Sequence, residues 1–214
     1  MIAVSLFDFT GAMLEPWLEA GYECHIFDIQ HPPGISRRDD GMILHGVDLR
    51  SFKWSDSGIN DSVAFLSCFP PCTNTSISGA RWFKGKGLRA LEESISFFAT
   101  CVEVSEALDC PYMLEQPMSV LSTYWREPDY KFHPSHYAPY ADDPKADFYT
   151  KQTWLWCSES FVMPPREVYD DDLFGKPDDK YIHHQAPGEN RANIRSATPQ
   201  GFARAVYQSQ TKTL

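Results

Sequence analysis

The sequence predicts an α/β fold with a mostly parallel, doubly wound sheet. Two observations predict it: apolar, β-prone runs alternate with segments of helical periodicity, and a polar or acidic turn follows most of these runs. The chain has 214 residues, of which 43% are hydrophobic and 22% charged, as expected of a globular protein with a sizeable core. We therefore expect one domain over residues 1–214.

The chain opens with strand, turn, helix and strand within its first 29 residues, the beginning of a nucleotide-binding sheet. Gly21 ends the first helix as a residue just beyond a helix terminus does. The expected elements, in chain order, are a strand over 1–7, a helix over 12–20, a strand over 22–29, a polar loop over 31–41, strands over 42–49 and 62–68, a helix over 88–108, strands over 111–114 and 153–156, and a helix over 199–208 with Thr198 as its N-cap.

The formal charge is −10, and acidic residues cluster in the second half of the chain. Proteins that grip duplex phosphates usually carry a clear basic stripe, so tight binding to DNA regardless of sequence is disfavoured. The six cysteines form no C-x-x-C pair and no zinc-type spacing, so we expect no metal site. No apolar stretch is long enough for a membrane span, and the start has no leader pattern. The expected location is the cytoplasm.

Residues at three predicted strand ends suit a nucleotide-like cofactor. The turn at Thr10 and Gly11 lets the backbone approach a ligand before a helix N-terminus. Asp28 ends the second strand, where a carboxylate accepts hydrogen bonds from ribose hydroxyls, and Asp48 ends the third, where it could bind an adenine amino group. Ordinary turns and strand ends contain the same residue types, so these residues alone leave both interpretations open.

A more specific run follows the fourth predicted strand: Phe-Pro-Pro-Cys-Thr-Asn-Thr-Ser-Ile-Ser-Gly over residues 69–79. Its Pro71-Cys72 pair and its Ser-Ile-Ser-Gly segment resemble the cytosine-C5 DNA methyltransferase family, in a compact, phage-like form. Phe9-Thr10-Gly11, Asp28, Asp48 and Glu115-Gln116-Pro117 are similar to further motifs of that family, in the same order. The resemblance covers roughly residues 5–120.

The resemblance implies a Rossmann-like methyltransferase fold, S-adenosylmethionine as the cofactor, and an enzyme that methylates carbon 5 of cytosine. A thiolate that adds to carbon 6 activates carbon 5, and a carboxyl group at ring N3 assists this step. The implied catalytic residues are Cys72 and Glu115. The implied cofactor-binding residues are Phe9, Thr10, Gly11, Asp28, Asp48 and Pro70, and the implied substrate-side residues are Pro71, Ser76, Ser78, Arg81, Lys84, Gln116, Pro117 and Lys151.

The second half of the chain departs from the family. Met13 replaces the second glycine of the first cofactor motif, and Lys151-Gln152-Thr153 lacks the arginines of the motif that it best matches. The stretch between Trp156 and Arg195 is short and acidic, whereas the family places a long base-reading segment there. We therefore expect cofactor and catalytic motifs over 1–120, substrate-side loops and a helix over 121–214, and no target-recognition domain.

This absence favours a cytosine presented outside a duplex, as a free nucleotide or within single-stranded DNA. A phosphate could be held by the basic loop over 81–86, by 124–131, or by His183 and His184 with Arg191 and Arg195, and each of these is also compatible with an ordinary solvated loop. His183 and His184 could instead bind a metal. Two other interpretations stay open: a catalytic subunit whose DNA target is read by a separate chain, and a non-catalytic binding module. The oligomeric state cannot be inferred.

Overall fold

A seven-stranded sheet forms the centre of the protein, with strand order β3-β2-β1-β4-β5-β7-β6. The computed structural model describes residues 1–59, 62–167, 169, 175–181 and 196–212. The strands are β1 (Ile2–Leu6), β2 (Glu23–Arg37), β3 (Ile43–Gly46), β4 (Val63–Cys68), β5 (Tyr112–Pro117), β6 (Tyr130–Phe132) and β7 (Thr153–Cys157), and the main helices are α1 (Glu15–Glu19), α2 (Phe83–Ala107), α3 (Leu121–Tyr124) and α7 (Gln200–Thr211).

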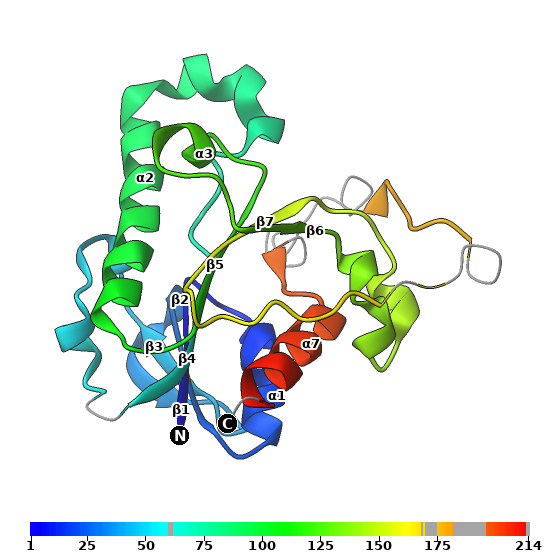
Figure 1. Ribbon diagram of the computed structural model, residues 1–214. Helices are drawn as coiled ribbons and strands as arrows, with labels where there is room; N and C mark the ends of the chain where they lie inside the picture. The colour runs from blue at the N-terminus through cyan, green and yellow to red at the C-terminus, as the bar shows by residue number, and fades with distance from the viewer. Residues whose placement is uncertain (60–61, 168, 170–174, 182–195, 213–214) are drawn as a thin grey trace.

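Neighbouring strands from β3 to β5 pair in parallel, whereas β7 runs antiparallel to both β5 and β6. Helix α2 lies along one side of this sheet, and α1 and α7 lie together on the other (Figure 1). The predicted α/β class, with a mostly parallel and doubly wound sheet, is therefore confirmed. The carboxyl ends of β1, β2, β3, β4 and β5 lie at one edge, where ligands bind in such sheets.

The sheet separates two hydrophobic cores, and adjacent residues of β4 contribute to opposite ones. Phe65 belongs to the core under α1 and α7, where its ring stacks on Trp17 with centroids 4.6 Å apart. Leu66 belongs to the core under α2, together with Phe98. This alternation explains why β4 reads as a continuous apolar run in the sequence, because both of its faces are covered.

Four elements differ from the sequence expectations. The expected polar loop over 31–41 is largely strand, because β2 continues to Arg37 and its last residues pair with β3 in descending register, from Gly34 opposite Gly46 to Arg37 opposite Ile43. Helix α2 begins at Phe83 and is interrupted at Gly87, which has φ 76° and ψ 178°. The short strand β6 was not predicted. Pro199, not Thr198, is the N-cap of α7, and no side chain caps it.

Candidate active site at the carboxyl edge of the sheet

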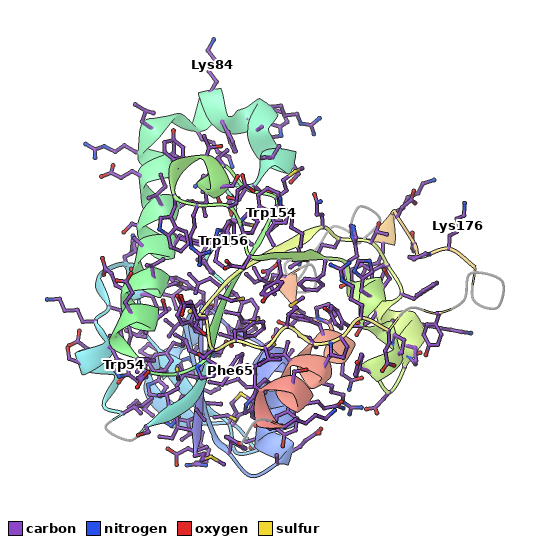
Figure 2. The ribbon with its side chains drawn as sticks, in the orientation of Figure 1. Trp54, Phe65, Lys84, Trp154, Trp156 and Lys176 are labelled. Atoms are coloured by element: carbon purple, nitrogen blue, oxygen red, sulfur yellow. The ribbon has the colours of Figure 1, made fainter. Side chains whose placement is uncertain are left out.

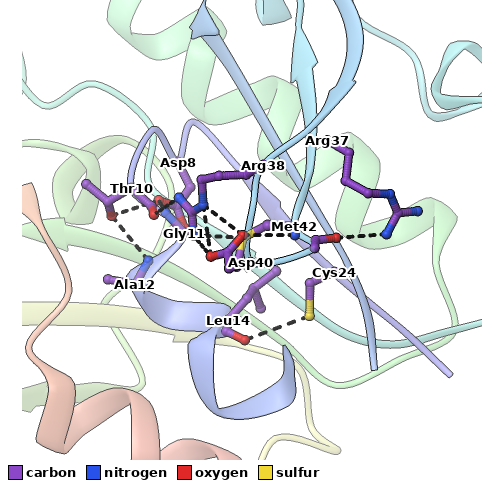
Figure 3. Close-up of polar contacts among 11 residues, drawn as sticks. Asp8, Thr10, Gly11, Ala12, Leu14, Cys24, Arg37, Arg38, Asp40 and Met42 are labelled. Atoms are coloured by element: carbon purple, nitrogen blue, oxygen red, sulfur yellow. Dashed lines mark hydrogen bonds and ion pairs between the residues drawn. The ribbon is translucent and has the colours of Figure 1, made fainter. Parts of the chain in front are cut away.

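The turn after β1 is held by the buried carboxylate of Asp8. Its Oδ1 accepts hydrogen bonds from the Gly11 N–H at 2.7 Å and the Thr10 hydroxyl at 3.2 Å (Figure 3). Its Oδ2 accepts one from the Ser5 hydroxyl at 2.9 Å. Gly11 has φ 73°, a left-handed conformation that favours glycine, and a Cβ there would lie 2.5 Å from the sulfur of Met42. Burial raises the pKa of Asp8. This role of Asp8 was not predicted, although an aspartate three residues before a glycine is typical of such a turn.

Asp28 lies next to this turn, because the backbone N–H of Asp8 donates to Phe27 at 3.2 Å. Its side chain is buried, and Oδ1 accepts hydrogen bonds from the Gln30 backbone at 2.8 Å and the Gln30 amide at 3.2 Å. Phe9, on the turn itself, is 39% exposed and stacks on His31 with centroids 5.4 Å apart. Phe9, Gly11 and Asp28 thus lie at one part of the sheet edge.

The carboxylate of Asp48 is bound to the neighbouring Arg50. Asp48 caps a short 3-10 helix over 49–51, where its carboxylate accepts from the Arg50 N–H at 3.0 Å and from Nε of Arg50 at 2.8 Å. The Arg50 guanidinium holds the pKa of Asp48 below its usual range.

The nearby His45 ring stacks on Phe27, and burial lowers the pKa of His45 to about 4.

The turn that carries Cys72 is fastened to β5 by one side chain. Gln116, which is 1% exposed, donates from its amide to the Pro70 carbonyl at 2.7 Å and accepts from the Thr75 hydroxyl at 3.0 Å. Within the turn, the backbone N–H groups of Thr75 and Ser76 donate to the Cys72 carbonyl at 3.1 and 2.9 Å. Gln116 therefore spans both ends of the turn and fixes it beside Glu115.

Cys72 is the only half-buried cysteine of the six, all of which the structure describes; the other five are buried. Burial raises the pKa of Cys24 and of Cys110 to about 12, so these thiols stay protonated near neutral pH. Cys72 is therefore the cysteine that is most accessible to a ligand.

The segment after Cys72 pairs with the chain that leaves β5. The backbone N–H of Ile77 donates to Met118 at 2.9 Å, and that of Val120 donates to Thr75 at 3.0 Å. Ser76 and Ser78, predicted on the substrate side, are joined through their hydroxyls at 2.9 Å. Pro71 is exposed within the turn, and Pro117 ends β5 at the same edge.

Glu115 points a partly unsatisfied carboxyl group into a narrow pocket at this edge. Its Oε1 is buried and has no hydrogen-bond partner among the described residues, and the ammonium of Lys151 lies 3.8 Å away. Burial raises the pKa of Glu115, and the positive charge of Lys151 opposes this shift. The aromatic walls of the pocket come from Phe69, Phe132 and Phe202. A buried carboxyl oxygen without a hydrogen bond is costly unless a ligand completes its contacts.

In the basic segment over 81–86, Lys86 contacts the Cys72 turn, whereas Arg81 and Lys84 were the residues expected to do so. Lys84 extends outward from the start of α2 (Figure 2), and the Arg81 guanidinium lies over the exposed ring of Trp82 at 5.1 Å. Lys86 instead donates to the carbonyl of Thr73, the residue after Cys72, at 2.7 Å. The sequence indicated a role for this segment but not this contact, because the contact joins residues that are 13 positions apart.

Several predicted features lie outside the described residues: His183, His184, Arg191 and Arg195. Within the described part of the chain, no group of three or more His, Cys, Asp or Glu side chains is arranged to hold a metal ion. No helix in that part combines the length and apolar character needed to cross a membrane.

Comparison with known proteins adds little. No family model matches the chain, and no curated protein sequence matches it. One solved structure that resembles it is an E. coli prophage protein described as a candidate DNA modification methyltransferase, with 13% identity and a TM-score of 0.45. The match covers 87% of this chain and 55% of the other, so this chain spans about half the length of that protein.

Proposed function

We propose that the protein is an S-adenosylmethionine-dependent methyltransferase that acts on carbon 5 of cytosine, with Cys72 as a covalent nucleophile and Glu115 as its acid partner. One observation carries this proposal. Gln116 hydrogen-bonds both ends of the Cys72 turn, while the adjacent Glu115 presents a buried carboxyl oxygen with no hydrogen-bond partner among the described residues. A half-buried thiol and a buried carboxyl group are thereby held on neighbouring strand ends.

Cys72 and Glu115 suit the two requirements of this reaction, which are activation of carbon 5 and stabilisation of the charge that develops on the ring. Carbon 5 of cytosine is a weak nucleophile, so the Cys72 thiolate forms a bond to carbon 6 and makes carbon 5 electron-rich. Glu115 holds a proton at N3 as negative charge develops on the ring, which its raised pKa favours. After carbon 5 has gained its methyl group, loss of its proton and cleavage of the sulfur–carbon 6 bond restore the ring and the thiolate.

The edge formed by β1, β2 and β3 fits the proposed cofactor. S-adenosylmethionine supplies, when bound, an electrophilic methyl group. Asp28 is a buried carboxylate beside the fixed Asp8 turn, the type of acceptor that ribose hydroxyls need, and Phe9 offers an exposed ring nearby. Asp48 would reach an adenine amino group only after releasing Arg50.

Asp28→Ala is expected to weaken binding of S-adenosylmethionine by about 10- to 100-fold, the range for losing a hydrogen bond to a charged group. Isothermal calorimetry on the purified chain measures this effect, and circular dichroism checks that the fold is retained. Asp39→Ala, a change at an exposed aspartate of the same region, is the matched control. Unchanged affinity in the Asp28 variant would remove this residue from the cofactor site.

Lys151→Met is expected to move the alkaline limb of the activity profile to higher pH. If Glu115 acts as an acid, kcat/KM falls as the pH rises through the raised pKa of Glu115. Lys151 stabilises the charged carboxylate, so its removal raises that pKa further. The measurement is kcat/KM across a pH series, with Lys145→Met, an exposed lysine, as the control. A midpoint that stays in place or moves down contradicts the assignment.

We propose further that the cytosine is read as a nucleotide outside a duplex. The net charge of −10 opposes accumulation on DNA, and the segment between β7 and α7 leaves little chain for base readout. A free nucleotide is favoured over single-stranded DNA on the same grounds. The alternatives are a subunit that needs a separate recognition chain and a binding module without catalysis.

The test compares methyl transfer from labelled S-adenosylmethionine to dCMP, dCTP, single-stranded DNA and duplex DNA across a salt series. The proposal predicts the highest kcat/KM for a nucleotide outside a duplex, with weak salt dependence. A preference for duplex DNA that falls steeply with salt would favour the subunit alternative. Cofactor binding without transfer to any of these substrates would favour the binding module.

A further inference from the structure

A second pocket lies behind the Cys72 turn, between the first turns of α2 and helix α3. Its volume is about 400 Å³, within the range of small-molecule sites. It is separate from the Glu115 pocket, since the two share no lining residue. We call it the α2 pocket, and its principal lining residues are Asn74, Phe83, Lys84, Lys86, Leu88 and Tyr124.

All charged side chains that line the α2 pocket are positive. Lys84 and Lys86 are the only charged residues in its lining. This local excess of positive charge occurs in a chain with a net charge of −10. Because the chain as a whole repels anions, this positive charge favours the binding of an anionic ligand at the α2 pocket itself.

The pocket is also lined by aromatic and apolar side chains that remain exposed in the described structure. Tyr124 is 67% exposed and Leu88 is 84% exposed, although both line the pocket. Phe83 contributes a second ring. Aromatic rings beside basic side chains are the combination that binds a nucleotide, because the base stacks on a ring and the phosphate meets a cation.

We propose that the α2 pocket binds a second nucleotide unit, distinct from the target cytosine. This inference rests on the proposed function for the identity of the target cytosine at Cys72. The binding of a nucleotide in the α2 pocket can be tested without it. The unit can come from two sources: a free nucleotide, or the neighbour of the target cytosine in a single strand. Base stacking on Tyr124 and phosphate contacts to Lys84 serve both sources equally.

The pocket is connected directly to the catalytic turn. Lys86 donates to the Thr73 carbonyl at 2.7 Å, and the Asn74 amide donates to the Ala90 carbonyl at 3.0 Å and to the Ser94 hydroxyl at 3.1 Å. Thr73 and Asn74 are the two residues after Cys72, so the pocket wall lies within about two residue lengths of the nucleophile, roughly 8 Å. A nucleotide bound there would be adjacent to a cytosine at Cys72.

Binding measurements separate the two sources without requiring turnover. Calorimetry with dCMP and with a tetramer of deoxycytidylate is carried out on the full chain, on Tyr124→Ala and on Lys84→Ala. Arg89→Ala is the control, since Arg89 is exposed on the same segment, pairs with Glu92 and does not line the pocket. Tyr124 and Lys84 are exposed, so both variants are expected to fold.

If the second unit belongs to a strand, the tetramer binds about tenfold more tightly than dCMP, and each pocket variant removes most of that advantage while dCMP binding stays unchanged. If it is a free nucleotide, dCMP occupies two sites and each pocket variant weakens one of them by about tenfold. Identical binding of both ligands by the wild type, both pocket variants and Arg89→Ala overturns the proposal. Intact pocket binding in a chain that never transfers a methyl group would overturn the proposed function alone.

Discussion

Replacing Cys72 by serine is expected to reduce methyl transfer by about 1,000-fold or more and to leave the affinity for S-adenosylmethionine almost unchanged. Nucleophiles that form a covalent intermediate have effects of this size or larger, because the remaining pathway loses its easier first step. A hydroxyl at neutral pH does not replace a thiolate. The turn itself should survive, because its hydrogen bonds use the Cys72 carbonyl and not the side chain.

The Cys72 variant is measured by single-turnover transfer of a labelled methyl group to the best nucleotide substrate. Thr73→Ser, the adjacent exposed position, is the matched control and should retain activity within a few-fold. Transfer by Cys72→Ser at a rate close to that of the control would show that no covalent step at Cys72 is needed.

Glu115→Gln is expected to reduce kcat by about 100- to 10,000-fold, the usual contribution of a positioned acid or base. The amide keeps the shape of the side chain but cannot hold a transferable proton at N3. Burial with a raised pKa is what suits the carboxyl group to this role. Because glutamine is neutral, the variant also removes the partner of Lys151, so folding stability has to be compared by thermal unfolding.

The same substitution at an exposed glutamate on α2, Glu103→Gln, controls for the loss of one negative charge. The expected pattern is a large fall in kcat for Glu115→Gln and none for Glu103→Gln. A variant that changes only KM would assign Glu115 to substrate binding, not to proton transfer.

Much of the sheet and of the candidate site could be predicted from the sequence, because burial periodicity locates strands and the ends of parallel strands meet at one edge. Cys72 follows β4 and Glu115 lies within β5. These two strands pair with Cys68 opposite Leu114, so the proximity of the two residues follows from the strand order. The strand over Thr153–Cys157 was predicted almost to its ends, because it is buried throughout.

Side-chain partners could not be predicted, because they depend on contacts between distant residues. Gln116 reaches Pro70 across 46 positions of sequence, and nothing local indicates this hydrogen bond. The same holds for the hydrogen bond of Lys86 to Thr73 and for the part of β2 that continues to Arg37. Asp48 was expected to be open to a ligand, but it is engaged by Arg50 two residues away.

A covalent bond between Cys72 and carbon 6 of a cytosine can be trapped as an adduct with 5-fluoro-dCMP. Fluorine at carbon 5 leaves no proton to remove after methyl transfer, so the bond to sulfur persists. Intact-mass spectrometry with S-adenosylmethionine present should find the protein heavier by the methylated nucleotide, and peptide mapping should place that mass on Cys72. Methylation of ordinary dCMP with no adduct at Cys72 from the fluorinated analogue would contradict the account.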